Sequence, residues 1–223
     1  MNDTANLARQ RLRTPRAAAV AGILFAVLLT TVLALSLSSV PKDPLESGAW
    51  LGANTNRVIL AIGLMPFVGV AFLWFVGVVR DRMAEAEDRL FATVFLGSAL
   101  LFLGMMFVAA SVFGAVVMVN VARPDALANS ATFAVVRAFA YILVNVYALK
   151  MACVFMIVTS TLALRTKFLA RWIAFPGLAM ALFLLFASQL FDLSFAIFPA
   201  WVLLISVYIL IDNFQLVQKL RQG

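Results

Sequence analysis

The chain has 223 residues, of which 65% are hydrophobic and only 12% are charged. Soluble domains carry about 25% charged residues, roughly twice this fraction, so the composition excludes a water-soluble globular fold. The chain contains no histidine and a single cysteine. A histidine-ligated haem, a cysteine or histidine zinc site, a Ser-His-Asp triad and an internal disulfide are therefore excluded as well.

The gaps between charged residues indicate where the chain crosses a membrane, because a charge in hydrocarbon costs on the order of a few kcal/mol. About 20 apolar residues, each rising about 1.5 Å, cross an apolar core about 30 Å thick. We predict an all-α integral membrane protein, a single bundle of six transmembrane helices in which both termini lie on the same side. The predicted spans are residues 17–40, 58–79, 90–119, 132–164, 172–189 and 195–213.

The basic residues predict which side holds the termini, because lysine and arginine accumulate in short cytoplasmic segments. With the N-terminus inside, twelve of the 17 basic residues lie in inner segments and three in outer segments. Both termini are thus predicted to be cytoplasmic, in the cytoplasmic (inner) membrane of a bacterium. The net charge of +7 follows from this topology and from attraction to anionic headgroups, and we expect no nucleic-acid partner.

The basic start of the chain, followed by an apolar run, also fits a secretory signal. The run over residues 17–41 is longer than the usual signal core of about 7 to 15 residues. We therefore expect an uncleaved first helix.

The segment that follows the first span leaves two alternatives open. Asp43-Pro44-Leu45-Glu46 has the form of a helix start, with a capping carboxylate and proline in the first turn. We expect either a short helix lying on the outer surface or an irregular loop.

The third span is longer than a membrane requires, and so is the fourth. Either both helices are strongly tilted, or their outer ends project beyond the bilayer as a hairpin around residues 120–129. We favour projection, because Arg123, Pro124 and Asp125 are typical of a water-exposed turn.

Small residues repeat along the third span. Gly97, Gly104 and Ser111 are seven residues apart, and Ala110 with Gly114 adds a pair four apart. Such patterns let helix backbones approach closely. We predict Gly97, Gly104, Ser111 and Gly114 as helix-packing residues, and a dimer interface is the more specific alternative.

Two basic residues, Arg137 and Lys150, interrupt the fourth span. Lys150 lies 14 residues above the inner end at Leu164, or about 21 Å, which is beyond the midplane. Arg137 lies 13 residues further, near the outer interface, where its long stem can snorkel. At about 100° per residue the two side chains point about 220° apart, so we expect them to contact different neighbours.

Other polar side chains on this span define the candidate site. Arg137 heads a stripe with Tyr141 and Asn145, whereas Lys150 shares its side of the helix with Tyr147. Asp192, in the turn between the last two spans, is the candidate counter-ion, and its predicted height allows pairing with either basic residue. The candidate substrate or ion-pair residues are Lys150, Arg137, Asp192, Tyr147, Asn145 and Tyr141.

Two interpretations of Lys150 remain open. A buried ammonium needs a counter-charge, a water-filled cavity or a lowered pKa. In the functional interpretation, Lys150 binds or relays an anionic substrate, a lipid headgroup or a proton. In the structural interpretation, it is fixed to Asp192 or to backbone carbonyls and stabilises the bundle.

No glycine-rich phosphate loop, HExxH or GxSxG motif occurs, so we expect neither an enzyme nor a cofactor. Met105 and Met106 lack further soft ligands, and we expect no metal site. Our first hypothesis is a non-enzymatic scaffold or accessory subunit that packs in the lipid bilayer with itself or with a larger membrane complex. The alternative is a small transporter or channel for an anionic solute or lipid, with Lys150 lining the path and Pro66 and Pro176 marking broken helices.

Overall fold

A computed structural model of the chain describes residues 2–41, 43, 45–83, 89–123, 130–166, 169–187 and 194–222. In this part of the chain every regular element is a helix. The elements are α1 (Asn2–Ser39), α2 (Trp50–Met83), α3 (Arg89–Ala122), α5 (Ala131–Ile142), the π-helix η2 (Leu143–Ala148), α6 (Leu149–Thr166), α7 (Arg171–Ala187), the 3-10 helix η4 (Ser194–Ala196) and α8 (Ile197–Gln222).

The helices have the length and apolar character of membrane spans, as the sequence predicts. Among the described residues, five stretches are long and apolar enough to cross a membrane: Ala19–Ser39, Trp50–Asp81, Arg89–Ala122, Ala131–Thr166 and Ser194–Gln215. The sixth apolar helix, α7, has 17 residues and is shorter. The chain is therefore a multi-pass helical bundle, and a full crossing by α7 stays a prediction.

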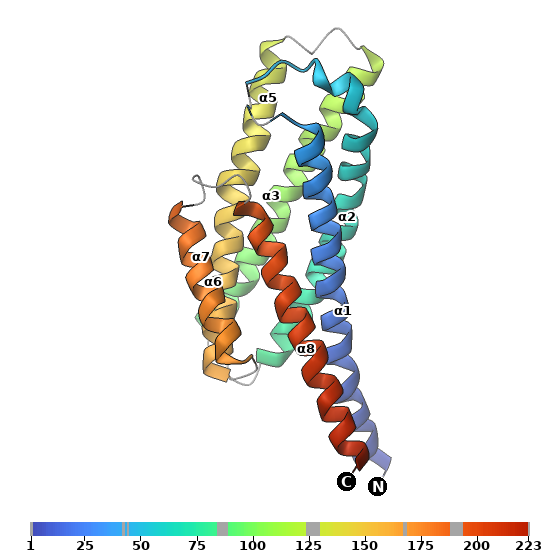
Figure 1. Cartoon of the computed structure of the whole chain (residues 1–223), viewed down its shortest axis with the longest axis vertical. Helices are drawn as coiled ribbons and strands as arrows, with labels where there is room; N and C mark the ends of the chain where they lie inside the picture. The colour runs from blue at the N-terminus through green and yellow to red at the C-terminus, as the bar shows by residue number, and fades with distance from the viewer. Residues whose placement is uncertain are drawn as a thin grey trace.

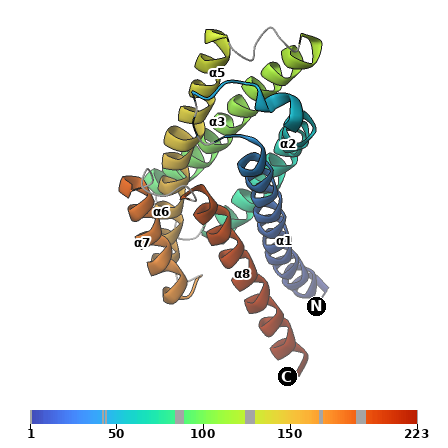
Figure 2. The same ribbon diagram turned by 45° about the horizontal axis from the view of Figure 1, so that its top comes forward.

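Neighbouring helices pack in a ring. α1 packs on α2 and α8, α2 on α3, α3 on α6, and α6 on α7. Figure 1 shows α7 and α8 beside α6 in the lower part of the view, whereas α1, α2, α3 and α5 continue into the upper part. Figure 2 shows the same arrangement from a second direction. In Figure 1 the bundle is widest where α6 and α7 lie beside α8, and only α1 and α8 continue to its lower end.

Both ends of the chain lie at the lower end of the bundle in these views (Figures 1 and 2). We call this the terminal end, and the opposite end the distal end. A cytoplasmic location of the terminal end stays a prediction.

Phe72 lies at the centre of an aromatic core to which five helices contribute. Its ring centroid lies 4.7 Å from that of Phe25, 5.3 Å from Phe102, 5.5 Å from Phe155 and 5.9 Å from Phe198. All five rings are buried. Helices in lipid associate by close packing, and aromatic pairs add about 0.5–1.5 kcal/mol each beyond the area that they bury. This core joins α8 to the other helices.

Close helix approach occurs at three glycines outside the predicted stripe. A Cβ atom added to Gly22 would collide with Ser206, one added to Gly69 with Phe107, and one added to Gly177 with Trp201. A larger residue at any of these positions would force a neighbouring side chain to move.

The predicted packing stripe on α3 has few close neighbours among the described helices. No described heavy atom lies within 4 Å of a Cβ added to Gly97 or Gly104, and only Ile62, at 3.9 Å, approaches Gly114. Ser111 is exposed. Gly114 lies beside α2, whereas Gly97 and Gly104 have no described neighbour at the Cβ position, so packing of this stripe against a second chain stays a prediction.

Both helix-interior prolines lie within continuous helices. α2 runs through Pro66 and α7 runs through Pro176. The broken helices that the transporter hypothesis requires are absent from these two described elements.

The connection between α1 and α2 is irregular in its described part. Residues 45–49 form turns and bends, and α2 begins at Trp50. The Asp43 carboxylate accepts a hydrogen bond from the Leu45 N–H over 2.9 Å, so it caps a turn. Of the two predicted alternatives, the structure shows the loop.

Candidate functional site

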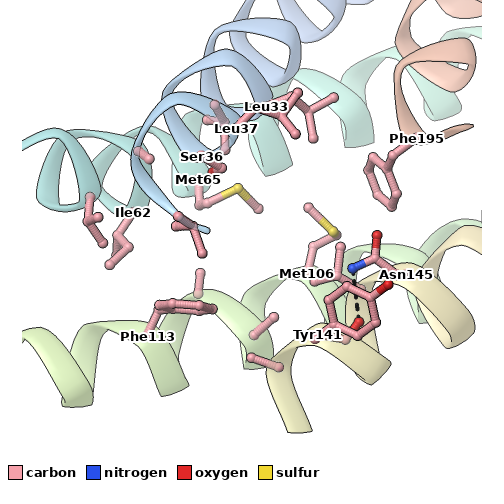
Figure 3. A pocket seen from close by; sticks show the side chains of 18 of the residues that line it. Leu33, Ser36, Leu37, Ile62, Met65, Met106, Phe113, Tyr141, Asn145 and Phe195 are labelled. Carbon is pink, nitrogen blue, oxygen red and sulfur yellow. Dashed lines mark hydrogen bonds between the residues drawn. The ribbon is translucent and has the colours of Figure 1, made fainter. Parts of the chain in front are cut away.

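A cavity of about 330 Å³ lies between α1, α2, α3 and α5 in the distal part of the bundle. Its volume falls within the range of about 300–1,000 Å³ that is typical of small-molecule sites. Figure 3 shows side chains from these helices converging on it, including Leu33, Ile62 and Phe113. The cavity is partly enclosed and mostly apolar.

The deep end of the cavity is lined by apolar side chains. Met65 of α2, Met106 of α3 and Phe195 of η4 lie on this side of the cavity (Figure 3), and Leu149 of α6 and Ser194 of η4 also line it. Phe195 belongs to the short 3-10 helix directly before α8. This end offers flexible and aromatic groups that suit an apolar chain.

Polar side chains gather along one face of α5 and η2. Arg137, Tyr141 and Asn145 all line the cavity, with Ser36 contributed by α1. The side-chain amide of Asn145 donates a hydrogen bond to the Tyr141 carbonyl over 3.1 Å, as the dashed line in Figure 3 shows. The sequence prediction that Arg137, Tyr141 and Asn145 share one face is confirmed.

Arg137 holds the connection between α1 and α2 over the distal end of α5. Only 4% of the residue is exposed. Its Nη1 donates to the Glu46 carbonyl over 2.7 Å, and its Nη2 donates to the Pro41 carbonyl over 2.6 Å. Its Cζ lies 5.4 Å from the centre of the Trp50 ring. The guanidinium therefore helps to hold the α1–α2 connection in place at the distal end of the cavity. The sequence analysis predicted only that this side chain could snorkel near the outer interface.

The π-helix η2 is a structural feature beside the cavity that was not predicted from the sequence. The Leu149 N–H donates to the carbonyl of Val144, five residues earlier, and both residues line the cavity. Short π-helical segments are rare and frequently occur at functional sites. Residues 143–148 contain neither glycine nor proline, so the sequence carried no signal for it.

Lys150 lies apart from the cavity-lining residues and contacts α7. Its Nζ donates to the Leu184 carbonyl over 3.2 Å and to the Leu185 carbonyl. Carbonyls in the last turn of a helix have no intrahelical partner, and a cation there is favourable. Backbone carbonyls are the partners that the structural interpretation named, so these contacts support it. They also agree with the prediction that Lys150 and Arg137 contact different neighbours.

Two other candidate residues are not brought into the cavity by the described structure. Tyr147 is 54% exposed and is not among the lining residues. Asp192 lies outside the described residues, so its predicted pairing with Lys150 or Arg137 is not tested.

Asn145, Tyr141 and Arg137 lie progressively further toward the distal end than Leu149, whereas Ser194, also in the lining, lies beside Phe195. The Arg165 guanidinium lies 4.6 Å from the centre of the Phe91 ring, which places the terminal ends of α6 and α3 at a common level. Helical rise from Arg165 puts Leu149 about 24 Å, Asn145 about 30 Å and Arg137 roughly 40 Å along the axis. Arg137 therefore lies further toward the distal end of this helix than Asn145 and Leu149.

No family model, no curated protein and no solved structure matches the chain.

Proposed function

We propose that the chain is a non-enzymatic, multi-pass membrane protein that binds one amphipathic, lipid-like molecule at its distal end. The apolar chain of the ligand lies between Met65 and Met106, and its polar head faces Tyr141 and Arg137. The observation that carries this proposal is the cavity itself, because it is mostly apolar and has polar side chains along one face of α5 and η2.

The packing of the helices supports a ligand that comes from the membrane. α1 packs on α2 and α8, whereas α5 packs on α3, and the cavity separates α1 from α5. α7 and α8 do not extend beside α5 (Figure 1). A lipid-like molecule moving between α1 and α5 would reach the cavity without crossing water.

A cavity-filling variant with a matched control tests the proposal. Ala110 lines the cavity, whereas Ala115 is exposed on the same helix and does not. Ala110→Leu adds volume inside the site, and overpacking of about 1–3 kcal/mol corresponds to an affinity loss of about 5- to 150-fold. Ala115→Leu is expected to retain the wild-type affinity for a long-chain amphiphile, measured by native mass spectrometry in detergent. Equal binding by both variants contradicts the proposal.

The scaffold or accessory-subunit function that the sequence favours is a second candidate. Gly97 and Gly104 leave part of α3 without a described neighbour, which is what a helix–helix contact with another chain requires. In this proposal the protein lies in the inner membrane of a bacterium, and both of its termini are cytoplasmic. Gly104→Leu is expected to lower the proportion of oligomer after gentle extraction, whereas Gly77→Leu, on an open face of α2, is not. A monomeric wild type contradicts self-association.

The transporter alternative through Lys150 is less well supported by the described contacts. The Lys150 ammonium is bonded to the end of α7, and a solute path along it would require these hydrogen bonds to break. Anion recognition is better assigned to the cavity.

A further inference from the structure

We infer that the head group of the cavity ligand is an anion, a carboxylate or a phosphate, and that Arg137 is the cation that binds it. This inference rests on the proposed function and specifies the class of ligand. It is carried by the burial of Arg137, its hydrogen-bond partners and its position at the distal end of a mostly apolar cavity.

The charge of Arg137 distinguishes it from the other described cavity-lining residues. Among the described residues that line the cavity, Arg137 is the one that carries a charge. Both of its hydrogen-bond acceptors are neutral carbonyl oxygens. The carboxylates of Glu46 and Asp43 act on it electrostatically, but both residues are exposed. A buried cation without a directly bonded anion is costly, and an anionic ligand would supply the missing charge.

The hydrogen-bond donors of the Arg137 guanidinium also suit an anion. A guanidinium has five N–H groups arranged as a planar fork. Glu46 and Pro41 accept from two of these groups, one on each Nη. The remaining donors match the two oxygens of a carboxylate or phosphate, which arginine binds bidentately. The two carbonyls and the Trp50 ring hold the guanidinium in place before the ligand arrives.

Two neutral polar side chains lie next to Arg137 along the same helical face. Tyr141 and Asn145 follow Arg137 at intervals of four residues, about 6 Å of helical rise each. The Asn145 amide nitrogen already donates to the Tyr141 carbonyl, and the Tyr141 and Asn145 side chains lie side by side in the cavity lining (Figure 3). These neutral groups suit the hydroxyls or ester oxygens below an anionic head. They lie between Arg137 and the apolar deep end.

The test compares three amphiphiles with the same chain and different heads, namely oleate, oleoyl lysophosphatidate and monoolein. Their affinities for the full-length wild-type protein are measured by native mass spectrometry in one detergent. We expect at least one of the two anionic amphiphiles to bind about tenfold more tightly than monoolein, a difference of about 1.4 kcal/mol. Whether oleate or the lysophosphatidate binds more tightly distinguishes a carboxylate from a phosphate.

The outcomes separate this inference from the proposed function. Equal affinity for all three amphiphiles overturns the anionic head and leaves the proposed function standing. Binding of none of them overturns both. In the wild type the comparison requires no variant to fold, and Arg137→Lys provides a second test because it keeps the charge and removes the fork. If Arg137→Lys binds the preferred anion as tightly as the wild type does, bidentate recognition is overturned.

Discussion

The guanidinium carbon of Arg137 lies 5.4 Å from the centre of the Trp50 ring. This contact joins the beginning of α2 to α5, and the same guanidinium donates to two carbonyls of the α1–α2 connection. One residue of the fourth span thus holds the chain segment that closes the distal end of the bundle. The same residue lines the cavity, so the proposed ligand binding would depend on it as well.

Removing the Arg137 guanidinium should destabilise the protein. Arg137→Gln loses two charge-assisted hydrogen bonds and a cation–π contact, and we expect a loss of about 2–4 kcal/mol in the free energy of unfolding. Thermal unfolding in detergent, followed by circular dichroism, measures the change. Arg57→Gln, on the exposed surface of α2, serves as the control. Equal midpoints for the two variants would show that the Arg137 contacts contribute nothing.

Replacing Lys150 should loosen the end of α7. Lys150→Met removes the donor to the Leu184 and Leu185 carbonyls, and a helix end without such a partner frays in an apolar environment. We expect faster amide hydrogen exchange over the last turns of α7, with little change in α2. Tyr147→Phe, one turn away on an exposed side chain, is the control. Unchanged exchange in α7 would refute the stabilising role.

Truncating the central aromatic ring should be costly. Phe72 is fully buried among four other rings, and Phe72→Ala is expected to lower the free energy of unfolding by about 3–5 kcal/mol. Phe67 lies on the same helix but is 63% exposed, so Phe67→Ala should change the free energy of unfolding by about 0.5 kcal/mol or less. Chemical denaturation of both variants measures the difference. Similar losses would mean that Phe72 is not at the centre of the core.

Two glycine substitutions should have opposite effects. Gly177→Ala places a methyl group against Trp201 and Ser160, and overpacking is expected to cost about 1–3 kcal/mol. Gly97→Ala meets no described neighbour and should stabilise α3 by up to about 1 kcal/mol through helix propensity. Thermal midpoints of the two variants provide the comparison, and a destabilised Gly97→Ala would indicate a contact with a second chain.

Much of the bundle and part of the site could be predicted from the sequence. The absence of charges marks the long apolar helices, and the spacing of Arg137, Tyr141 and Asn145 places them on one face. Both inferences depend only on helical geometry and on the cost of charge in lipid. Backbone carbonyls were one of several partners that the sequence allowed for Lys150, with Asp192 among the others, and helical spacing did not choose between them.

The other parts of the fold and of the candidate site depend on which neighbour each helix face contacts. Helical spacing does not specify that neighbour. Gly97 and Gly104 have the spacing of packing residues but no described neighbour at the Cβ position, whereas Gly22 and Gly177 pack closely. Lipid tails and helix surfaces are both apolar, so the sequence pattern does not distinguish them. Arg137 donates hydrogen bonds to the carbonyls of Pro41 and Glu46. Because every residue has a backbone carbonyl, the sequence does not indicate which carbonyls Arg137 contacts, and only the tertiary structure shows it.

The most direct test of ligand binding in the cavity is photolabelling in a bilayer. A long-chain carboxylate with a photoactivatable group near the end of its chain is added to vesicles containing the full-length protein, and the labelled residues are mapped by mass spectrometry. Ligand binding in the cavity predicts labels at Met65, Met106 and Phe195 that excess oleate suppresses. Labels confined to exposed residues such as Phe67, Met118 and Phe186, unaffected by oleate, would contradict it.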